Sequence, residues 1–281
     1  MQSEIARPGG ARIATQTFGE ASNPSVLLIM GAMASMLWWP DEFCRALAER
    51  GLHVVRYDNR DTGLSTKYEP GKPGYTSADM VDDALAVLDG HAIVRAHVVG
   101  MSMGGMLAQM LALQYPARVA SLSVISTSPI GVDTSMLPGM TSAYQTHSVK
   151  GADVDWSNRA QVIGFMIEDS RMLASTAHPF DATRLRDFVS HDYDRAGGLA
   201  SASNHFMVMD GVASESIRDL SVPLLVIHGT TDPIFPVEHG RALAAAVPGS
   251  LLVEVTGGGH ELHRNDWPIM IDAVAAHVRA G

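Results

Sequence analysis

The sequence has little of what several classes of protein need. It contains a single cysteine, Cys44, among 281 residues, so it can form no internal disulfide and no cysteine-based metal site. No apolar run approaches the roughly 18 residues of a membrane-spanning helix, and the first twenty residues lack the apolar stretch of a secretory signal. We therefore expect a cytoplasmic protein with no membrane span.

Positive charge is also scarce. The chain has 20 Lys and Arg against 30 Asp and Glu, a net charge of -10, and no basic run. Such a surface repels a phosphate backbone, so we expect a small-molecule partner and no nucleic acid. The twelve histidines lack carboxylate or cysteine partners at ligand spacing, and no phosphate-binding or dinucleotide fingerprint is present. We expect neither a metal nor a cofactor, and the sequence does not indicate the oligomeric state.

Apolar residues, in contrast, make up 46% of the chain, and they are arranged in a regular rhythm. Runs of strand length alternate with helical patterns, and the strand runs are apolar throughout, as in a sheet covered on both faces. Strands are predicted at 25–30, 53–58, 96–102, 119–126, 222–229 and 250–257, and helices at 40–51, 78–91, 104–116, 238–249 and 268–281. The alternation predicts an α/β protein with a doubly wound, mostly parallel sheet.

The rhythm breaks between residues 128 and 216. This segment has helix-like stretches at 157–174 and 182–197 but no convincing buried strand. We therefore predict a core domain formed by 1–127 and 217–281, with a helical cap inserted at 128–216.

Ser102 lies where a predicted strand meets a predicted helix, in the pattern Gly100-Met101-Ser102-Met103-Gly104. This is a nucleophile elbow, in which glycines allow strand and helix to pass closely while the serine side chain is exposed. Ser102 is the candidate nucleophile.

A serine hydroxyl needs a base to remove its proton, and His260 follows a late strand and three glycines. His263 is the main rival, and further alternatives are His91, His97 and His228. Asp232, in a loop after the strand at 222–229, is the candidate acid that orients the imidazole. The order Ser102, Asp232, His260 is the order that this elbow-type fold uses.

Acyl transfer also needs hydrogen-bond donors for the developing oxyanion. The candidates are the backbone N–H groups of Met103, at a helix N-terminus, and of Ala32, in the turn after the first apolar strand.

Two further groups of polar residues have structural interpretations. Asp58, Arg60 and Asp61 lie in a tight polar turn and are predicted to form a structural network. Cys44 lies in a helical pattern with no base nearby and is predicted to be a buried structural thiol.

With these motifs the sequence resembles the α/β-hydrolase superfamily, and within it the serine esterases of the aclacinomycin methylesterase group. The likeness is carried by residues 27–66, 86–105, 222–236 and 257–260, and it is much weaker in the cap. Many members of the superfamily have His-Gly where this chain has Met30-Gly31, a departure that the methylesterase group shares. The resemblance implies eight strands and a cap, and assigns the triad to Ser102, Asp232 and His260 and the oxyanion hole to Ala32 and Met103.

The expected function is hydrolysis of carboxylic esters through an acyl-enzyme, with a bulky apolar ester as one possible substrate. A lactonase, a C–C bond hydrolase or a cofactor-free perhydrolase would use the same triad. Haloalkane dehalogenases and epoxide hydrolases are disfavoured because they carry aspartate at the position of Ser102. A non-catalytic ligand-binding protein is the alternative from another class, and the complete triad argues against it. Methionines in or near the cap suggest a roomy apolar pocket, namely Met136, Met140, Met166, Met172, Met207 and Met209.

Overall fold

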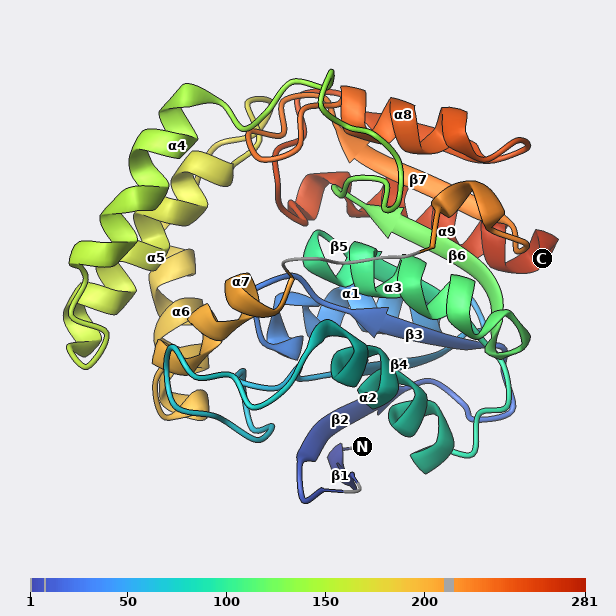
Figure 1. The fold of residues 1–281 in the computed structure, drawn as a ribbon, viewed down its shortest axis with the longest axis horizontal. Helices are drawn as coiled ribbons and strands as arrows, with labels where there is room; N and C mark the ends of the chain where they lie inside the picture. The colour runs from blue at the N-terminus through green and yellow to red at the C-terminus, as the bar shows by residue number, and fades with distance from the viewer. Residues whose placement is uncertain (1, 8, 210–214) are drawn as a thin grey trace.

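The centre of the molecule is an eight-stranded sheet (Figure 1), seen in a computed structural model that describes residues 2–7, 9–209 and 215–281. The strands follow the order β1-β2-β4-β3-β5-β6-β7-β8. They are β1 (Gln2–Ala6), β2 (Arg12–Phe18), β3 (Ser25–Ile29), β4 (His53–Tyr57), β5 (Ala96–Met101), β6 (Val119–Ile125), β7 (Leu224–Gly229) and β8 (Leu251–Val255). From β4 to β8 all neighbours are parallel, whereas β2 is antiparallel to both β1 and β4. The predicted mostly parallel α/β fold is confirmed.

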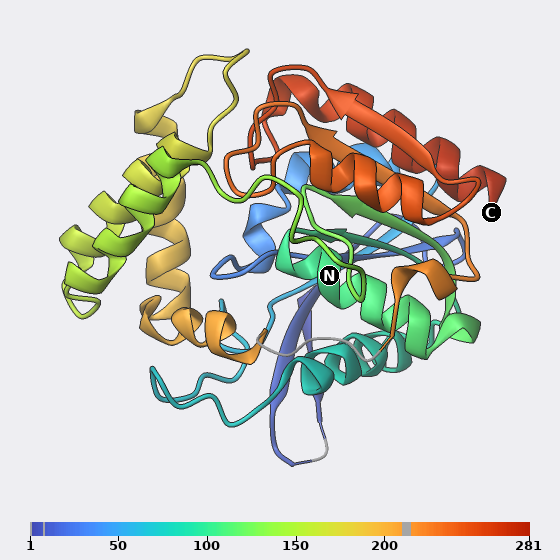
Figure 2. The ribbon, with the colours of Figure 1, turned by 45° about the horizontal axis from the view of Figure 1, so that its top comes forward.

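Helices cover both faces of this sheet. They are α1 (Asp41–Ala48), α2 (Ser77–Gly90), α3 (Met103–Gln114), α8 (Glu238–Ala246) and α9 (Trp267–Ala280). Successive residues of β3 point to opposite faces: Leu27 packs in a cluster with α2, α3 and α8, and Leu28 packs in a second cluster with α1 and α9. Figure 2 shows α2 and α3 in front of the strands and α9 behind them. Each fully buried aliphatic side chain in these layers stabilises the fold by about 1.5–3 kcal/mol relative to an exposed one.

The N-terminal hairpin was not among the strands predicted from apolar runs. Strand β1 is an exposed edge strand with one half-buried side chain, Ile5, and pairs along its whole length with β2. Its strand conformation depends on these backbone hydrogen bonds more than on burial, so its sequence gives no apolar signal.

A group of helices lies between β6 and β7 in the chain: α4 (Ser142–Ser148), α5 (Arg159–Leu173), α6 (Ala182–Ala196) and α7 (His205–Val208). α5 and α6 occupy the predicted helical stretches, and α4 and α7 were not predicted. The side chains of Asn158 and Asp181 cap α5 and α6 by accepting hydrogen bonds from first-turn N–H groups, and the left-handed Gly197 ends α6. α5 and α6 bury a small apolar cluster of their own.

This helical group lies at the end of the sheet toward which β3, β6 and β7 point (Figure 1). The boundaries 128–216 stay a prediction, and residues 210–214 of that range lie outside the described residues. The first residues of the range pack with the core: the Gln109 side chain of α3 bonds to the backbone of Ser128 and Ile130. Within the described ranges, no helix is long and apolar enough to cross a membrane.

Candidate active site

Ser102 lies at the turn between β5 and α3 with φ 55° and ψ -121°, a conformation that non-glycine residues rarely adopt. Two backbone contacts hold it there, because its N–H donates to the Ile125 carbonyl at 2.9 Å and its carbonyl accepts from the Thr127 hydroxyl at 2.8 Å. Strained residues of this kind persist when their surroundings fix them, and they cluster at functional sites.

The glycines beside Ser102 leave no room for a side chain. A β-carbon at Gly100 would lie 2.2 Å from the carbonyl oxygen of Gly104. A β-carbon at Gly104 would lie 2.2 Å from the carbonyl oxygen of Ile29 in β3. The steric task predicted for these glycines is confirmed, since β3, β5 and α3 approach one another backbone to backbone.

The turn after β3 lies directly against the serine. A β-carbon at Gly31 would be 3.1 Å from the β-carbon of Ser102 and 3.7 Å from its Oγ. Ala32 is the next residue, and Met103 is the first residue of α3, next to Ser102 on its other side. The turn that carries Ala32 therefore lies against Ser102, and the oxyanion roles of Ala32 and Met103 stay a prediction.

Asp232 and His260 form a buried hydrogen-bonded pair, with 2.7 Å between Asp232 Oδ2 and His260 Nδ1. The other carboxylate oxygen accepts from the N–H groups of Ile234 and Phe235, each at 2.9 Å. Burial alone would raise the pKa of Asp232, but the attraction and hydrogen bond of His260 outweigh it and hold this pKa below its ordinary value. An ionised Asp232 keeps the imidazole proton on Nδ1 and leaves Nε2 free to accept another proton.

Among the described residues, the Ser102 hydroxyl makes no hydrogen bond to His260. Catalytic hydrogen bonds of this kind are often long before substrate binds and shorten in the reacting complex.

The loops that carry Asp232 and His260 are joined to each other. The Thr231 N–H donates to the Gly258 carbonyl at 2.9 Å, and the Gly257 N–H donates to the Thr230 hydroxyl at 2.7 Å. The last turn of α5 in the cap completes this support, because the Leu173 carbonyl accepts from the His260 N–H at 2.8 Å. Sequence reasoning missed Leu173, since a backbone carbonyl leaves no signal in the choice of side chain.

The rival histidines have other partners. His97 bonds to Ser121 and His91 to Thr15, while His263 stacks on His178 with ring centroids 4.3 Å apart. His228 Nε2 lies 3.8 Å from Asp232 Oδ2, but it donates its hydrogen bond to the Phe235 carbonyl at 2.7 Å. Within the part of the chain that the structure describes, His260 is the histidine hydrogen-bonded to Asp232.

The polar turn after β4 is a buried network, as predicted. Arg60 forms two hydrogen bonds to Asp83, at 2.6 and 2.9 Å, and Asp61 accepts from the Tyr75 hydroxyl at 2.7 Å. Asp58 pairs with Arg195 of α6 at 2.7 Å, so the network also fastens the cap to the core.

Cys44 is fully buried in α1, and burial raises the pKa of its thiol to about 12. The structural interpretation of this residue is confirmed.

Among the residues that the structure describes, one group could hold a metal ion, although ligand spacing in the sequence gave no sign of it. His178 of the cap meets His263 and Asp266 of the core, and their ligand atoms lie within 4.8 Å of one another. At present His178 Nε2 bonds to Asp266 at 2.7 Å, and His263 Nδ1 accepts from the Asn265 N–H at 3.2 Å. Because Nδ1 accepts this bond, the His263 proton lies on Nε2. A metal at Nε2 would move the proton to Nδ1 and so break the bond from the Asn265 N–H. The group connects cap and core in its present form.

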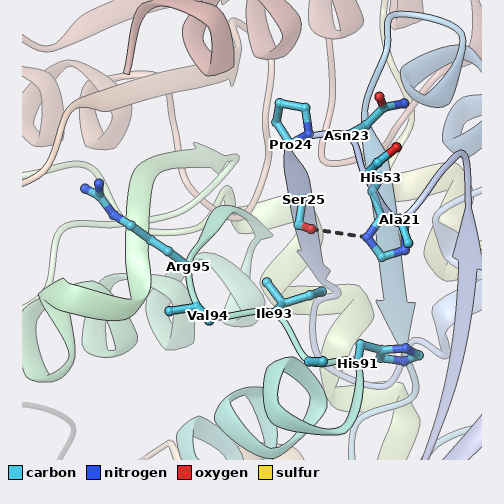
Figure 3. A pocket seen from close by; sticks show the side chains of 11 residues that line it. Ala21, Asn23, Pro24, Ser25, His53, His91, Ile93, Val94 and Arg95 are labelled. Carbon is cyan, nitrogen blue, oxygen red and sulfur yellow. Dashed lines mark hydrogen bonds between the residues drawn. The ribbon is translucent and has the colours of Figure 1, made fainter.

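A separate groove of about 540 Å³ lies at the amino ends of β3, β4 and β5 (Figure 3). Ser102, in contrast, follows the carboxyl end of β5. Its lining includes His53, which is hydrogen-bonded to Ser25 at 3.1 Å, together with His91 and Arg95. No carboxylate lines it, so it offers no acid to complete a second triad.

Comparisons with known proteins show which family the chain resembles. The family model of the alpha/beta hydrolase fold matches residues 24–265. Rhodomycin D methylesterase DauP of Streptomyces sp. (strain C5) is 32% identical to this chain, and the match covers 95% of this chain and 94% of that protein. A putative carbamate hydrolase, RutD, of Caulobacter vibrioides is 28% identical over 85% of this chain and 84% of its own. Among solved structures, a hydrolase from Pseudomonas aeruginosa PA01 is 26% identical, with a TM-score of 0.72 over 99% of this chain and 98% of that one.

These matches confirm the resemblance predicted from the motifs, including the likeness to the methylesterase group. The chain belongs to the alpha/beta hydrolase fold family.

Proposed function

We propose that this protein is a serine esterase that hydrolyses carboxylic esters through an acyl-enzyme, with Ser102 as nucleophile, His260 as base and Asp232 as orienting acid. The observation that carries the proposal is the buried 2.7 Å pair of Asp232 and His260, in the loops after β7 and β8, at the same carboxyl end of the parallel strands as the strained turn at Ser102. The proposed chemistry requires no cofactor.

In the first half of the reaction, Ser102 Oγ attacks the ester carbonyl carbon and its proton passes to His260 Nε2. The carbonyl oxygen becomes an oxyanion, which accepts hydrogen bonds from the N–H groups of Ala32 and Met103; one such donor contributes about 2.7–4 kcal/mol where this was tested in another hydrolase. The intermediate then expels the alcohol, which takes the proton from His260.

In the second half, water attacks the acyl-enzyme and gives its proton to His260. The second tetrahedral intermediate collapses to the free acid, and Ser102 Oγ regains a proton. Asp232 stays ionised throughout and stabilises the imidazolium formed in each half.

The full-length similarity to a rhodomycin D methylesterase supports a methyl ester of a bulky acid as substrate. The methionines that suggested a roomy apolar pocket give this idea less support than expected. Met136, Met140 and Met207 are exposed, and Met166 is buried in the cap's own apolar cluster. Substrate preference therefore rests on the relative rather than on these side chains.

The test is a panel of esters in which the acyl and the alcohol parts are varied independently, assayed with wild type and Ser102→Ala. We expect wild type to hydrolyse p-nitrophenyl acetate or butyrate and the Ser102→Ala protein to be inactive. A kcat/KM that rises with the size of the acyl part while the alcohol is methanol would support the methylesterase. Lactones and carbamates are assayed beside the panel, and a higher kcat/KM for them than for any open-chain ester would contradict the proposed substrate class while leaving the triad in place.

A further inference from the structure

His205, at the start of cap helix α7, is fully buried and reaches the turn that follows β3. Its Nδ1 lies 3.1 Å from the backbone nitrogen of Met33, and its Nε2 lies 2.7 Å from the backbone carbonyl oxygen of Arg60. One imidazole thus bridges two core loops from the cap.

The two backbone groups determine the protonation of this ring. The Met33 N–H can only donate, so Nδ1 accepts, and the Arg60 carbonyl can only accept, so Nε2 carries the proton. His205 is therefore neutral, in one tautomer. Burial lowers its pKa, with the Arg60 carbonyl and the charge of Asp61 acting in the opposite direction, so the neutral form persists at physiological pH.

The bridged turn is the one that carries the proposed oxyanion donor. Gly31 lies against Ser102, Ala32 follows, and Met33 comes next with φ 61°, a left-handed conformation that is costly for a methionine. Such a conformation needs external restraint, and the bond to His205 supplies it directly.

The rest of the turn has other anchors. Ser35 donates to Asp192 of α6 at 2.6 Å, and the Met36 N–H donates to Asp58 at 2.7 Å. The start of the turn is held by Asn59, whose Nδ2 donates to the Met30 carbonyl at 3.1 Å. Among the described residues, the Met33 N–H has His205 as its partner, so this side chain anchors the backbone that directly follows Ala32.

We propose that His205 is a positioning residue of the oxyanion hole: by accepting the Met33 N–H, it fixes the backbone that aims the Ala32 N–H at the reacting carbonyl oxygen. This inference rests on the proposed function and adds a cap residue to it. Because the residue comes from the cap, the same bond ties the geometry of the oxyanion hole to the docking of the cap on the core.

Two amide variants separate the two hydrogen bonds of His205. In His205→Asn the amide oxygen takes the position of Nδ1 and can still accept from Met33, while the bond to Arg60 is lost. In His205→Gln the amide nitrogen takes the position of Nε2 and can still donate to Arg60, while no acceptor remains at the Nδ1 position. Ser201→Ala is the matched control, since it removes a 2.7 Å bond from the same cap segment to the Tyr68 carbonyl, away from Ser102.

The readouts are kcat, KM, melting temperature and inhibition by phenylboronic acid, which forms a tetrahedral adduct on an active-site serine. We expect His205→Gln to lose about 10- to 100-fold in kcat with little change in KM, somewhat less than removal of an oxyanion donor itself. Its inhibition constant for phenylboronic acid should rise by a similar factor. His205→Asn and Ser201→Ala should stay within about threefold of wild type in both quantities.

A purely structural role predicts a different pattern, in which activity of all three variants follows their melting temperatures. Equal losses in His205→Asn and His205→Gln, or wild-type kcat in His205→Gln, would overturn the inference. If His205→Gln does not fold, His205→Ala replaces it in the same comparison. If wild type neither hydrolyses esters nor is inhibited by the boronic acid, the proposed function itself fails, and that result is distinct from all the others.

Discussion

Replacing Asp232 by asparagine keeps the shape of the side chain, but it removes the negative charge beside His260 and reverses the polarity of one hydrogen bond. The Asn oxygen can keep the two 2.9 Å bonds from the Ile234 and Phe235 N–H groups that Asp232 Oδ1 now accepts. The NH2 group then occupies the position of Oδ2, 2.7 Å from His260 Nδ1. Two donors cannot face each other, so Nδ1 loses its proton and Nε2 gains one. His260 can then no longer accept the proton of Ser102.

The size of the loss follows from the role of the base. In another serine hydrolase the same exchange lowers kcat about ten-thousandfold, which corresponds to about 5.4 kcal/mol at about 1.36 kcal/mol per factor of ten. We expect at least a hundredfold loss in kcat for Asp232→Asn. Folding should be nearly unaffected, because the two side chains have almost the same shape and the backbone bonds are kept.

Asp169 of α5 is the candidate for a substitute acid. It is partly buried, and burial raises its pKa, with His147, Tyr144 and His260 acting in the opposite direction. The double variant Asp232→Asn, Asp169→Asn therefore shows whether residual activity depends on Asp169. The assay measures kcat on p-nitrophenyl butyrate, with circular dichroism and melting temperature as folding controls. A folded Asp232→Asn protein with near-wild-type kcat would refute the assignment of the acid.

Three further predictions concern the scaffold around the site. Gly104→Ala should lower the free energy of unfolding by about 3 kcal/mol or more, because its β-carbon would meet the Ile29 carbonyl at 2.2 Å. In Gly164→Ala, in α5, the added β-carbon meets nothing within 4 Å, so the free energy of unfolding should rise by up to about 1 kcal/mol. Equal urea midpoints for the two variants would contradict this account. Cys44 should react with Ellman's reagent at least about a hundredfold more slowly in the folded than in the urea-unfolded protein at pH 8, because burial raises its pKa to about 12, and comparable rates would show that the thiol is accessible. His205 has a pKa below the ordinary 6.5 in the folded state, so its contribution to stability is complete above about pH 6.5 and is lost as the pH falls toward the folded value. Between those limits His205→Asn should reduce the slope of unfolding free energy against pH by up to about 1.4 kcal/mol per pH unit, measured by urea unfolding from pH 5 to 8, and an unchanged slope would argue against a neutral buried ring.

The parts that could be predicted from the sequence are those where one local pattern carries the information. Apolar strands such as β5 and the glycines around Ser102 are of this kind, because burial on both faces and a close backbone approach each restrict the residue type. Asp232 and His260 were also predictable, since each lies in a loop after a late strand and the chain order is characteristic. The edge strand β1 was not, because its order comes from hydrogen bonds with β2 rather than from its own side chains.

Contacts between the cap and the core were beyond prediction for a different reason. His205 is 172 residues from Met33 in the chain, and its partners are backbone groups that leave no mark on residue choice. The pairing of His178 with Asp266 is similar, as it depends on how α5 and the loop after it dock on the core. Such contacts follow from tertiary packing alone, and a single sequence contains no pattern that reports them.

The central claim is that Ser102 is the nucleophile, and covalent labelling tests it most directly. Wild type and Ser102→Ala are incubated with a serine-directed fluorophosphonate and examined by intact-mass spectrometry, followed by peptide mapping. A single adduct on wild type that maps to Ser102 and is absent from Ser102→Ala is the predicted result. An unlabelled wild type, or an adduct that persists in Ser102→Ala, would contradict the assignment.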